Sequence, residues 1–229
     1  MKVGTCGWGY FPEKGDRLRN YVRAGYSVVE VNSTFYRIPR ESTAAKWREK
    51  VDEINSKFEF TVKVSKIITH LDKFSSQKSV DAFEQMKAVG KALRAKILIF
   101  QSPHSFRPTA NNLKNADAFF SRIDRERFIL GWEVRWKSEW TREIVYSLFK
   151  RLDIVHVVDP LRQDSYNRKF GYYRLHGFGT PMMYNYTFSD EELRECISKI
   201  GMNSYVLFNN FTMYDDAKRF TQILKTKDS

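Results

Sequence analysis

Short apolar runs alternate with longer amphipathic stretches along all 229 residues, and this alternation constrains the fold more than any other feature. The apolar runs, which predict strands, are residues 2–6, 27–31, 58–64, 96–101, 127–135, 154–159, 171–176 and 205–209. The amphipathic stretches, which predict helices, are residues 16–24, 43–54, 79–94, 112–123, 139–152, 190–200 and 214–226. Repeated strand–helix units of this kind predict a parallel sheet covered by helices.

A parallel sheet of eight strands can close into a barrel or stay open as a doubly wound sheet. No GxGxxG or GxxxxGK[ST] motif follows the first strand, which argues against a nucleotide-binding doubly wound fold. We therefore predict an α/β fold, a (β/α)8 TIM-type barrel, formed by one domain over residues 1–229. Residues 161–169 stand where a helix is expected, so the helix between strands six and seven is predicted to be irregular or missing.

Local signals refine the predicted elements. Residues 67–77 are predicted to form a second long loop, with His70 in it. Ser79 and Ser189 are predicted N-caps, because serine hydroxyls accept hydrogen bonds from the first free backbone amides of a helix.

Polar residues interrupt the second strand on one face only. Side chains alternate across a strand, so Glu30 and Asn32 lie opposite the two valines that flank Glu30. The helices cover the valine face, and Glu30 is therefore predicted to point into the barrel. A buried carboxylate needs a cationic partner, for which the sequence offers Lys63, Arg135 or Arg174. An ion pair that only fixes strand register is an equally open interpretation.

The same alternation gathers polar residues near the carboxyl ends of the strands, where barrels carry their active sites. Asp159, Asn209 and Asn210 end strands six and eight, and His176 ends strand seven beside Gly177, at which backbone can approach a ligand closely. His156 has the opposite parity to Asp159 and is predicted to face the helices.

Composition bounds the partners. Thirty-nine Lys and Arg against 27 Asp and Glu give a formal charge of +12, which favours anionic small molecules or nucleic acid, although a basic solvated surface explains it equally well. Cys6 and Cys196 have no zinc-binding spacing, so we expect a reduced, cytoplasmic setting. No stretch of 18 apolar residues exists, so no membrane partner is expected.

Six motifs occur in an order that resembles the DUF72 family of YecE-like proteins. They are GTCGW at residues 4–8, VEVNSTFYR at 29–37, ITH at 68–70, WEVRW at 132–136, YRLHG at 173–177 and FNN at 208–210. The resemblance runs from residue 2 to about residue 224 and implies a TIM barrel. This family's barrel is similar to those of the endonuclease IV and xylose isomerase group, which suggests DNA binding or phosphoester chemistry by analogy alone.

The family motifs add residues to the candidate site and also depart from the family in two places. They add Ser33, Thr34, Tyr36 and His70 to the residues expected to bind a ligand. The family usually has serine where this chain has Cys6, and often has a histidine after the fifth strand where this chain has Trp136. A hydroxyl role at position 6 and histidine catalysis at position 136 are therefore not expected.

Two hypotheses follow from these residues. In the first, an enzyme holds an anionic substrate at the barrel mouth. Lys63, Arg135 and Arg174 would bind the anion, Glu30 or Glu133 would be the general base, His176 would donate a proton, and Asn32 and Asn209 would orient the substrate. Lys63 also suits a general base or a Schiff-base amine. Asp159 is expected to bind ligand, and one divalent ion held by Glu30, Glu133, Asp159 or His176 is left open.

In the second hypothesis, the chain is a non-enzymatic nucleic-acid binder or a small-ligand sensor. The charge and the aromatic residues near basic ones motivate it. It requires cations on a broad outer surface, whereas the enzyme requires them at the barrel mouth.

Overall fold

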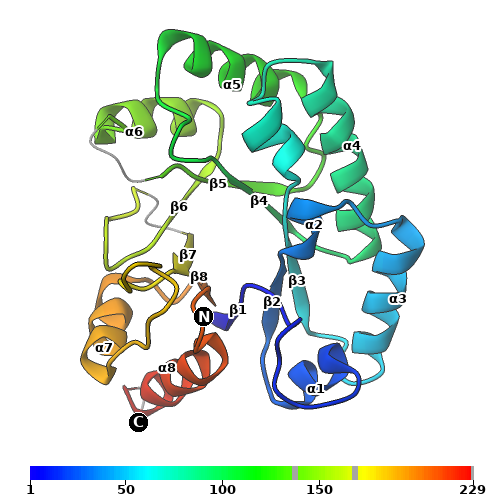
Figure 1. Cartoon of the computed structure of the whole chain (residues 1–229), viewed down its shortest axis with the longest axis vertical. Helices are drawn as coiled ribbons and strands as arrows, with labels where there is room; N and C mark the ends of the chain where they lie inside the picture. Colours follow the sequence, from blue (N-terminus) through cyan, green and yellow to red (C-terminus); the bar gives the residue numbers. More distant parts are fainter. Residues whose placement is uncertain (136–138, 167–169, 228–229) are drawn as a thin grey trace. The chain divides into compact units, whose positions relative to one another are not determined.

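Eight parallel strands form a closed barrel in chain order, as predicted. The computed structural model describes residues 1–135, 139–166 and 170–227. The strands are β1 (Lys2–Thr5), β2 (Val28–Val31), β3 (Glu59–Lys63), β4 (Ile97–Gln101), β5 (Ile129–Glu133), β6 (Val155–Val158), β7 (Gly171–Leu175) and β8 (Ser204–Phe208), labelled in Figure 1. Most residues of these strands are buried, which explains why they appear in the sequence as nearly continuous apolar runs.

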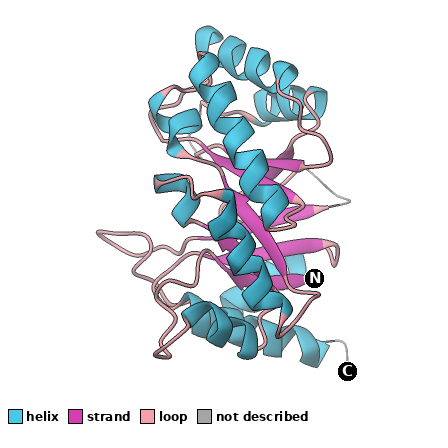
Figure 2. Cartoon of the chain, turned by 90° about the vertical axis from the view of Figure 1, so that its right-hand side faces the viewer, coloured by secondary structure: helices cyan, strands magenta, loops and turns pink. Residues whose placement is uncertain are grey.

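Helices follow the strands, as the alternation predicted (Figure 2, helices cyan and strands magenta). They are α1 (Arg17–Arg23), α2 (Ser33–Tyr36), α3 (Glu41–Asp52), α4 (Gln77–Ala92), α5 (Ala110–Arg122), α6 (Arg142–Arg151), α7 (Asp190–Lys199) and α8 (Met213–Lys227). In the described residues 159–166 and 170, between β6 and β7, no helix forms, in agreement with the prediction. Residues 167–169 of that predicted loop lie outside the described residues.

The segment 67–77 is not the simple loop that was predicted. Ile67–Leu71 form a π-helical turn, η1, in which the Asp72 amide donates to the Ile67 carbonyl oxygen at 2.9 Å. Ile68 and Thr69 are completely buried in this turn. Burial of those two side chains, which the polar flanks of the segment did not reveal, gives the backbone a reason to coil.

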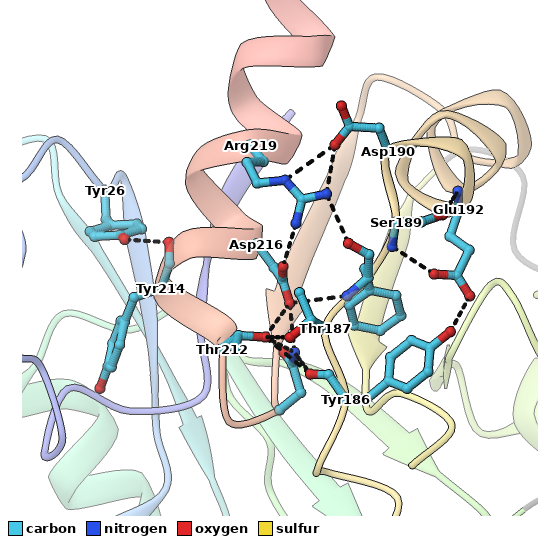
Figure 3. Close-up of polar contacts among 12 residues, drawn as sticks. Tyr26, Tyr186, Thr187, Ser189, Asp190, Glu192, Thr212, Tyr214, Asp216 and Arg219 are labelled. Atoms are coloured by element: carbon cyan, nitrogen blue, oxygen red, sulfur yellow. Dashed lines mark hydrogen bonds and ion pairs between the residues drawn. The ribbon is translucent and has the colours of Figure 1, made fainter.

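One of the two predicted helix caps is right and the other is wrong. Ser189 caps α7 and forms a reciprocal capping box with Glu192 (Figure 3). Ser76, rather than Ser79, caps α4. Ser79 is buried one turn inside that helix and donates to Asp72 at 2.5 Å. Asp72 also accepts from the Ser76 hydroxyl, so it fixes the start of α4 earlier than the apolar pattern suggested.

The chain divides into two compact units, which are described one at a time. Unit 1 contains Met1–Glu30, Lys50–Glu59 and Val157–Ser229, and unit 2 contains Val31–Glu49 and Phe60–His156. In unit 1, the rings of Tyr21 and Tyr26 stack 4.2 Å apart, and α7 packs beside α8. In unit 2, Phe74 and Trp132 belong to a cluster of buried aromatic rings that includes Phe100 and Phe120.

No helix in the described part of the chain is both long enough and apolar enough to cross a membrane.

Candidate functional site

Glu30 is held in a completely buried cluster within unit 1. Its Oε1 atom accepts from Arg174 Nη2 at 2.9 Å, and its Oε2 atom accepts from the Tyr172 hydroxyl at 2.9 Å. All three side chains are 0% exposed. Of the three cations that the sequence offered, Arg174 is thus a partner of Glu30. Tyr172 was missed, although strand alternation places it on the same face as Arg174.

Asp159 and His176 lie at the ends of β6 and β7 and are also completely buried. Asp159 Oδ2 accepts from the His176 backbone amide at 3.1 Å, and Oδ1 accepts from the Leu161 amide at 3.1 Å. The His176 Nδ1 atom lies 3.1 Å from Asn209 Nδ2. These side chains bind backbone and one another, and they fix the first residues of the loops that leave the barrel.

Gly177 has a backbone conformation and a close neighbour that both require glycine. Its φ of 85° lies in the left-handed region, and a Cβ there would come within 2.4 Å of the Tyr186 Cβ atom. Tyr186 therefore makes a close approach at this glycine, and the approach of a ligand there stays a prediction.

Asn210, which is predicted to bind a ligand, fastens two loops of unit 1. Its Nδ2 atom donates to Asp216 at 2.6 Å and to the Tyr186 carbonyl at 2.7 Å. Figure 3 shows how this network continues: Arg219 binds Asp216 at 3.0 Å and Asp190 at 2.6 Å. The end of the β7–α7 loop is thereby tied to the start of α8.

In unit 2, by contrast, cations gather where β3 and β5 end. Lys63 is the last residue of β3, and Lys66 follows three residues later. Arg135 follows β5 by two residues, and its Nη1 atom lies 3.2 Å from Glu133 Oε1. Glu133 is 1% exposed, so this ion pair is shielded from water. Lys66 was missed in the sequence, where its spacing from Lys63 in VKVSK was the available signal.

An aromatic side chain lies against one of these cations, Lys63. The Lys63 Nζ atom lies 4.2 Å from the centroid of the Phe35 ring, a cation–π contact. The Phe35 ring in turn meets the His70 ring edge-on at 4.9 Å. Thr34 donates to the backbone oxygens of Val31 and Lys63, each at 2.6 Å, which locks α2 onto β3. Thr34 is completely buried in this contact, and its role in ligand binding stays a prediction.

The pKa of His70 is affected by its burial and by the neighbouring cations. Burial, and after it the charges of Lys63, Arg135 and Lys66, together lower the pKa of His70 to about 4. The ring is therefore neutral at pH 7, with its Nδ1 atom 2.8 Å from the Thr69 hydroxyl. We call Lys63, Lys66, Arg135 and His70 the cation cluster.

The remaining predicted residues fall into two groups. Asn32, Ser33 and Tyr36 lie in or next to α2, where Ser33 and Tyr36 are exposed. His156 faces α6, as predicted, because its ring contacts Phe149 of that helix at 5.7 Å. Burial lowers the pKa of His156 to about 4, against the opposing charge of Glu133.

The search for a metal centre concerns the described residues only. Within residues 1–135, 139–166 and 170–227, no three His, Cys, Asp or Glu side chains lie close enough together to hold an ion. The divalent ion left open from the sequence thus has no three-ligand site in that part of the chain.

Comparison with known proteins agrees with the fold and adds no reaction. Residues 2–229 match the model of a family described as "Protein of unknown function DUF72". A DUF72 family protein from Enterococcus faecalis is 19% identical, with 98% of this chain and 97% of that chain covered and a TM-score of 0.75. A DUF72 family protein from Thermotoga maritima is 22% identical, with 98% and 99% covered and a TM-score of 0.74. The structure of SacUVDE is 10% identical, with 100% and 99% covered and a TM-score of 0.70. No curated protein matches.

Proposed function

The chain belongs to the DUF72 family, and within that family we propose that it binds an anionic, phosphate-bearing ligand through the cation cluster of unit 2. One observation supports this above the others. Three cations from the ends of two strands act on a single neutral histidine, and all three lower its pKa.

The cation cluster has the properties of an anion site. The charges of Lys63, Arg135 and Lys66 each disfavour a proton on His70, even though Glu133 pairs with Arg135. Side chains of like charge held close together repel one another, and an anion placed among them relieves that repulsion. A neutral imidazole can add a hydrogen bond without adding charge.

The position of the cluster also fits a binding site. Lys63 and Arg135 lie at the carboxyl ends of parallel strands, the end at which barrels carry their ligands. Thr34 and Phe35 hold α2 and Lys63 in place, so the donors are arranged before a ligand arrives.

Inorganic phosphate is the first probe to use, titrated by calorimetry at pH 7.5 and low ionic strength. The protein should bind it, and Lys66→Glu should weaken binding by about tenfold or more, because one attractive charge becomes repulsive. Lys114→Glu, the same charge change at an exposed position on α5, is the matched control and should leave binding unchanged.

The two variants separate a site from a general effect of charge. Equal weakening by Lys66→Glu and Lys114→Glu would show that only the net charge matters. No binding by the unaltered protein would refute the proposal.

Phosphoester hydrolysis is a second candidate, supported by one observation: the buried Glu133 carboxylate lies in the same region as Arg135 and the neutral His70. Such a carboxylate can act as general base while the cations stabilise developing negative charge. Labelled single-stranded, double-stranded and abasic DNA, and RNA, are incubated with Mg²⁺, Mn²⁺, Zn²⁺ or EDTA and resolved on a denaturing gel. Cleavage that is lost in Glu133→Gln at an unchanged melting temperature supports hydrolysis. Uncut substrates in every lane refute hydrolysis, and only the proposal of anion binding then stands.

A further inference from the structure

Resting on the proposed function, we infer that the ligand of the cation cluster is a nucleoside phosphate, whose base stacks on Tyr36 while its phosphate is held by the neighbouring cations. The proposed function specifies an anionic, phosphate-bearing ligand, and this inference specifies its chemical class. It depends on the placement of one exposed aromatic ring beside the cations.

Tyr36 is the last residue of α2 and is 72% exposed. Single exposed aromatic residues are common on protein surfaces and need no explanation. Tyr36 differs because a cation of the cluster lies next to it: the Lys66 Nζ atom is 6.0 Å from the centroid of its ring. An accessible aromatic ring and a phosphate-holding ammonium are thus within the reach of one small ligand.

The position of the ring is fixed by the same residue that positions the cluster. The Phe35 ring meets the Tyr36 ring edge-on, with centroids 5.1 Å apart and planes at 90°. Phe35 also contacts Lys63 and His70. Phe35 therefore sets the spacing between the ring of Tyr36 and two members of the cation cluster, Lys63 and His70, and this rigidity favours binding.

A nucleoside phosphate matches this arrangement. Its phosphate is an anion for Lys63, Lys66 and Arg135, and its base offers a planar face to Tyr36. Base stacking on aromatic side chains tolerates any base, because every base has a π-face. The same chemistry is present in a free nucleotide and in a single-stranded nucleic acid, which the experiment separates.

The test compares the affinities of four probes by calorimetry: inorganic phosphate, ribose 5-phosphate, adenosine 5′-monophosphate and a short oligothymidylate. Adenosine 5′-monophosphate should bind roughly 5- to 150-fold more tightly than ribose 5-phosphate, the increment expected from stacking one base. Tyr36→Ala should abolish that difference without changing the affinity for inorganic phosphate. Tyr36→Phe should keep it, because the ring remains.

Controls keep the inference separate from the proposal on which it rests. Tyr10→Ala removes another exposed tyrosine, 88% exposed, and should change nothing. If inorganic phosphate binds and adenosine 5′-monophosphate binds no better than ribose 5-phosphate, the inference fails and the proposed function stands. If inorganic phosphate fails to bind, the proposed function itself fails. Tighter binding of oligothymidylate than of adenosine 5′-monophosphate assigns the site to single strands, and the reverse assigns it to free nucleotides.

Discussion

Two clusters of charged side chains, one in each unit, differ in the balance of the charges that they bring together. In unit 1, Glu30, Arg174 and Tyr172 satisfy one another and are completely sealed from water. In unit 2, three cations, one of them paired with Glu133, surround a neutral histidine and leave an excess of positive charge. A buried pair of opposite charges is stable while both charges are present. Like charges that lie close together are stabilised by a ligand of opposite charge. The sum of the charges, rather than their burial, thus distinguishes a structural cluster from a binding one.

The largest effect is expected when one charge is removed from each cluster. Arg174→Met leaves the Glu30 carboxylate buried without its cation and should lower the free energy of unfolding by about 3–5 kcal/mol. Lys66→Met removes a cation from a cluster with excess positive charge and should change it by less than about 0.5 kcal/mol. Urea denaturation followed by circular dichroism measures both values.

A compensating variant makes that test specific. Glu30→Gln combined with Arg174→Met removes both charges and should recover much of the loss, since an unpaired buried charge is the main penalty. If Lys66→Met and Arg174→Met lowered the free energy of unfolding by comparable amounts, the proposed difference between the two clusters would be wrong.

A smaller effect is expected where unit 1 uses an amide at a strand end. Asn210→Ala removes the hydrogen bonds to Asp216 and to the Tyr186 carbonyl and should lower the free energy of unfolding by about 1–3 kcal/mol. Asn210→Ala should leave the affinity for inorganic phosphate in unit 2 unchanged. A loss of phosphate affinity in a variant that is still folded would instead return Asn210 to the ligand site predicted from the sequence.

The smallest effect expected is the response of a pKa to an added anion, and it concerns the two histidines of low pKa in unit 2. The pKa of His70 and that of His156 are lowered from 6.5 to about 4. Between these two pH values, the unfolded chain therefore binds more protons than the folded chain. Their contribution to stability is complete above about pH 6.5 and is lost as the pH falls towards about 4.

An anion should affect only one of these histidines. Sulfate, whose charge is constant over this range of pH, should raise the pKa of His70 by offsetting Lys63, Lys66 and Arg135, and should leave His156 unchanged. Nuclear magnetic resonance titration of the ring protons, with chloride at matched ionic strength as control, gives both values. Parallel shifts of the two rings would indicate a general salt effect.

Periodicity predicted the barrel because each strand–helix unit is visible in local sequence. Strand parity also predicted that Glu30 points inward to a cation and that His156 faces a helix. It could not select Arg174 among three cations, because that choice depends on which strands lie near one another in three dimensions. Nor could it foresee that Thr34, Asn210 and Gly177 are occupied by protein groups, since nothing local in the sequence records their partners.

Lys66 and η1 show a second limit. Both belong to the segment after β3, where polar residues and short apolar runs suggested a loop. The cation cluster depends on that segment, because the π-helical turn carries His70 and begins directly after Lys66. A site built from irregular backbone has no period, and its residues are therefore found from structure and not from pattern.

The contact between Gly177 and Tyr186 affects how the evolution of this chain should be interpreted. A side chain at position 177 would collide with the Cβ atom that every residue except glycine places at position 186. Selection against such a collision would keep glycine at position 177 whatever the barrel binds. Invariance there among related chains would therefore measure loop packing, and a ranking of positions by conservation would place Gly177 beside true binding residues for a reason unrelated to binding.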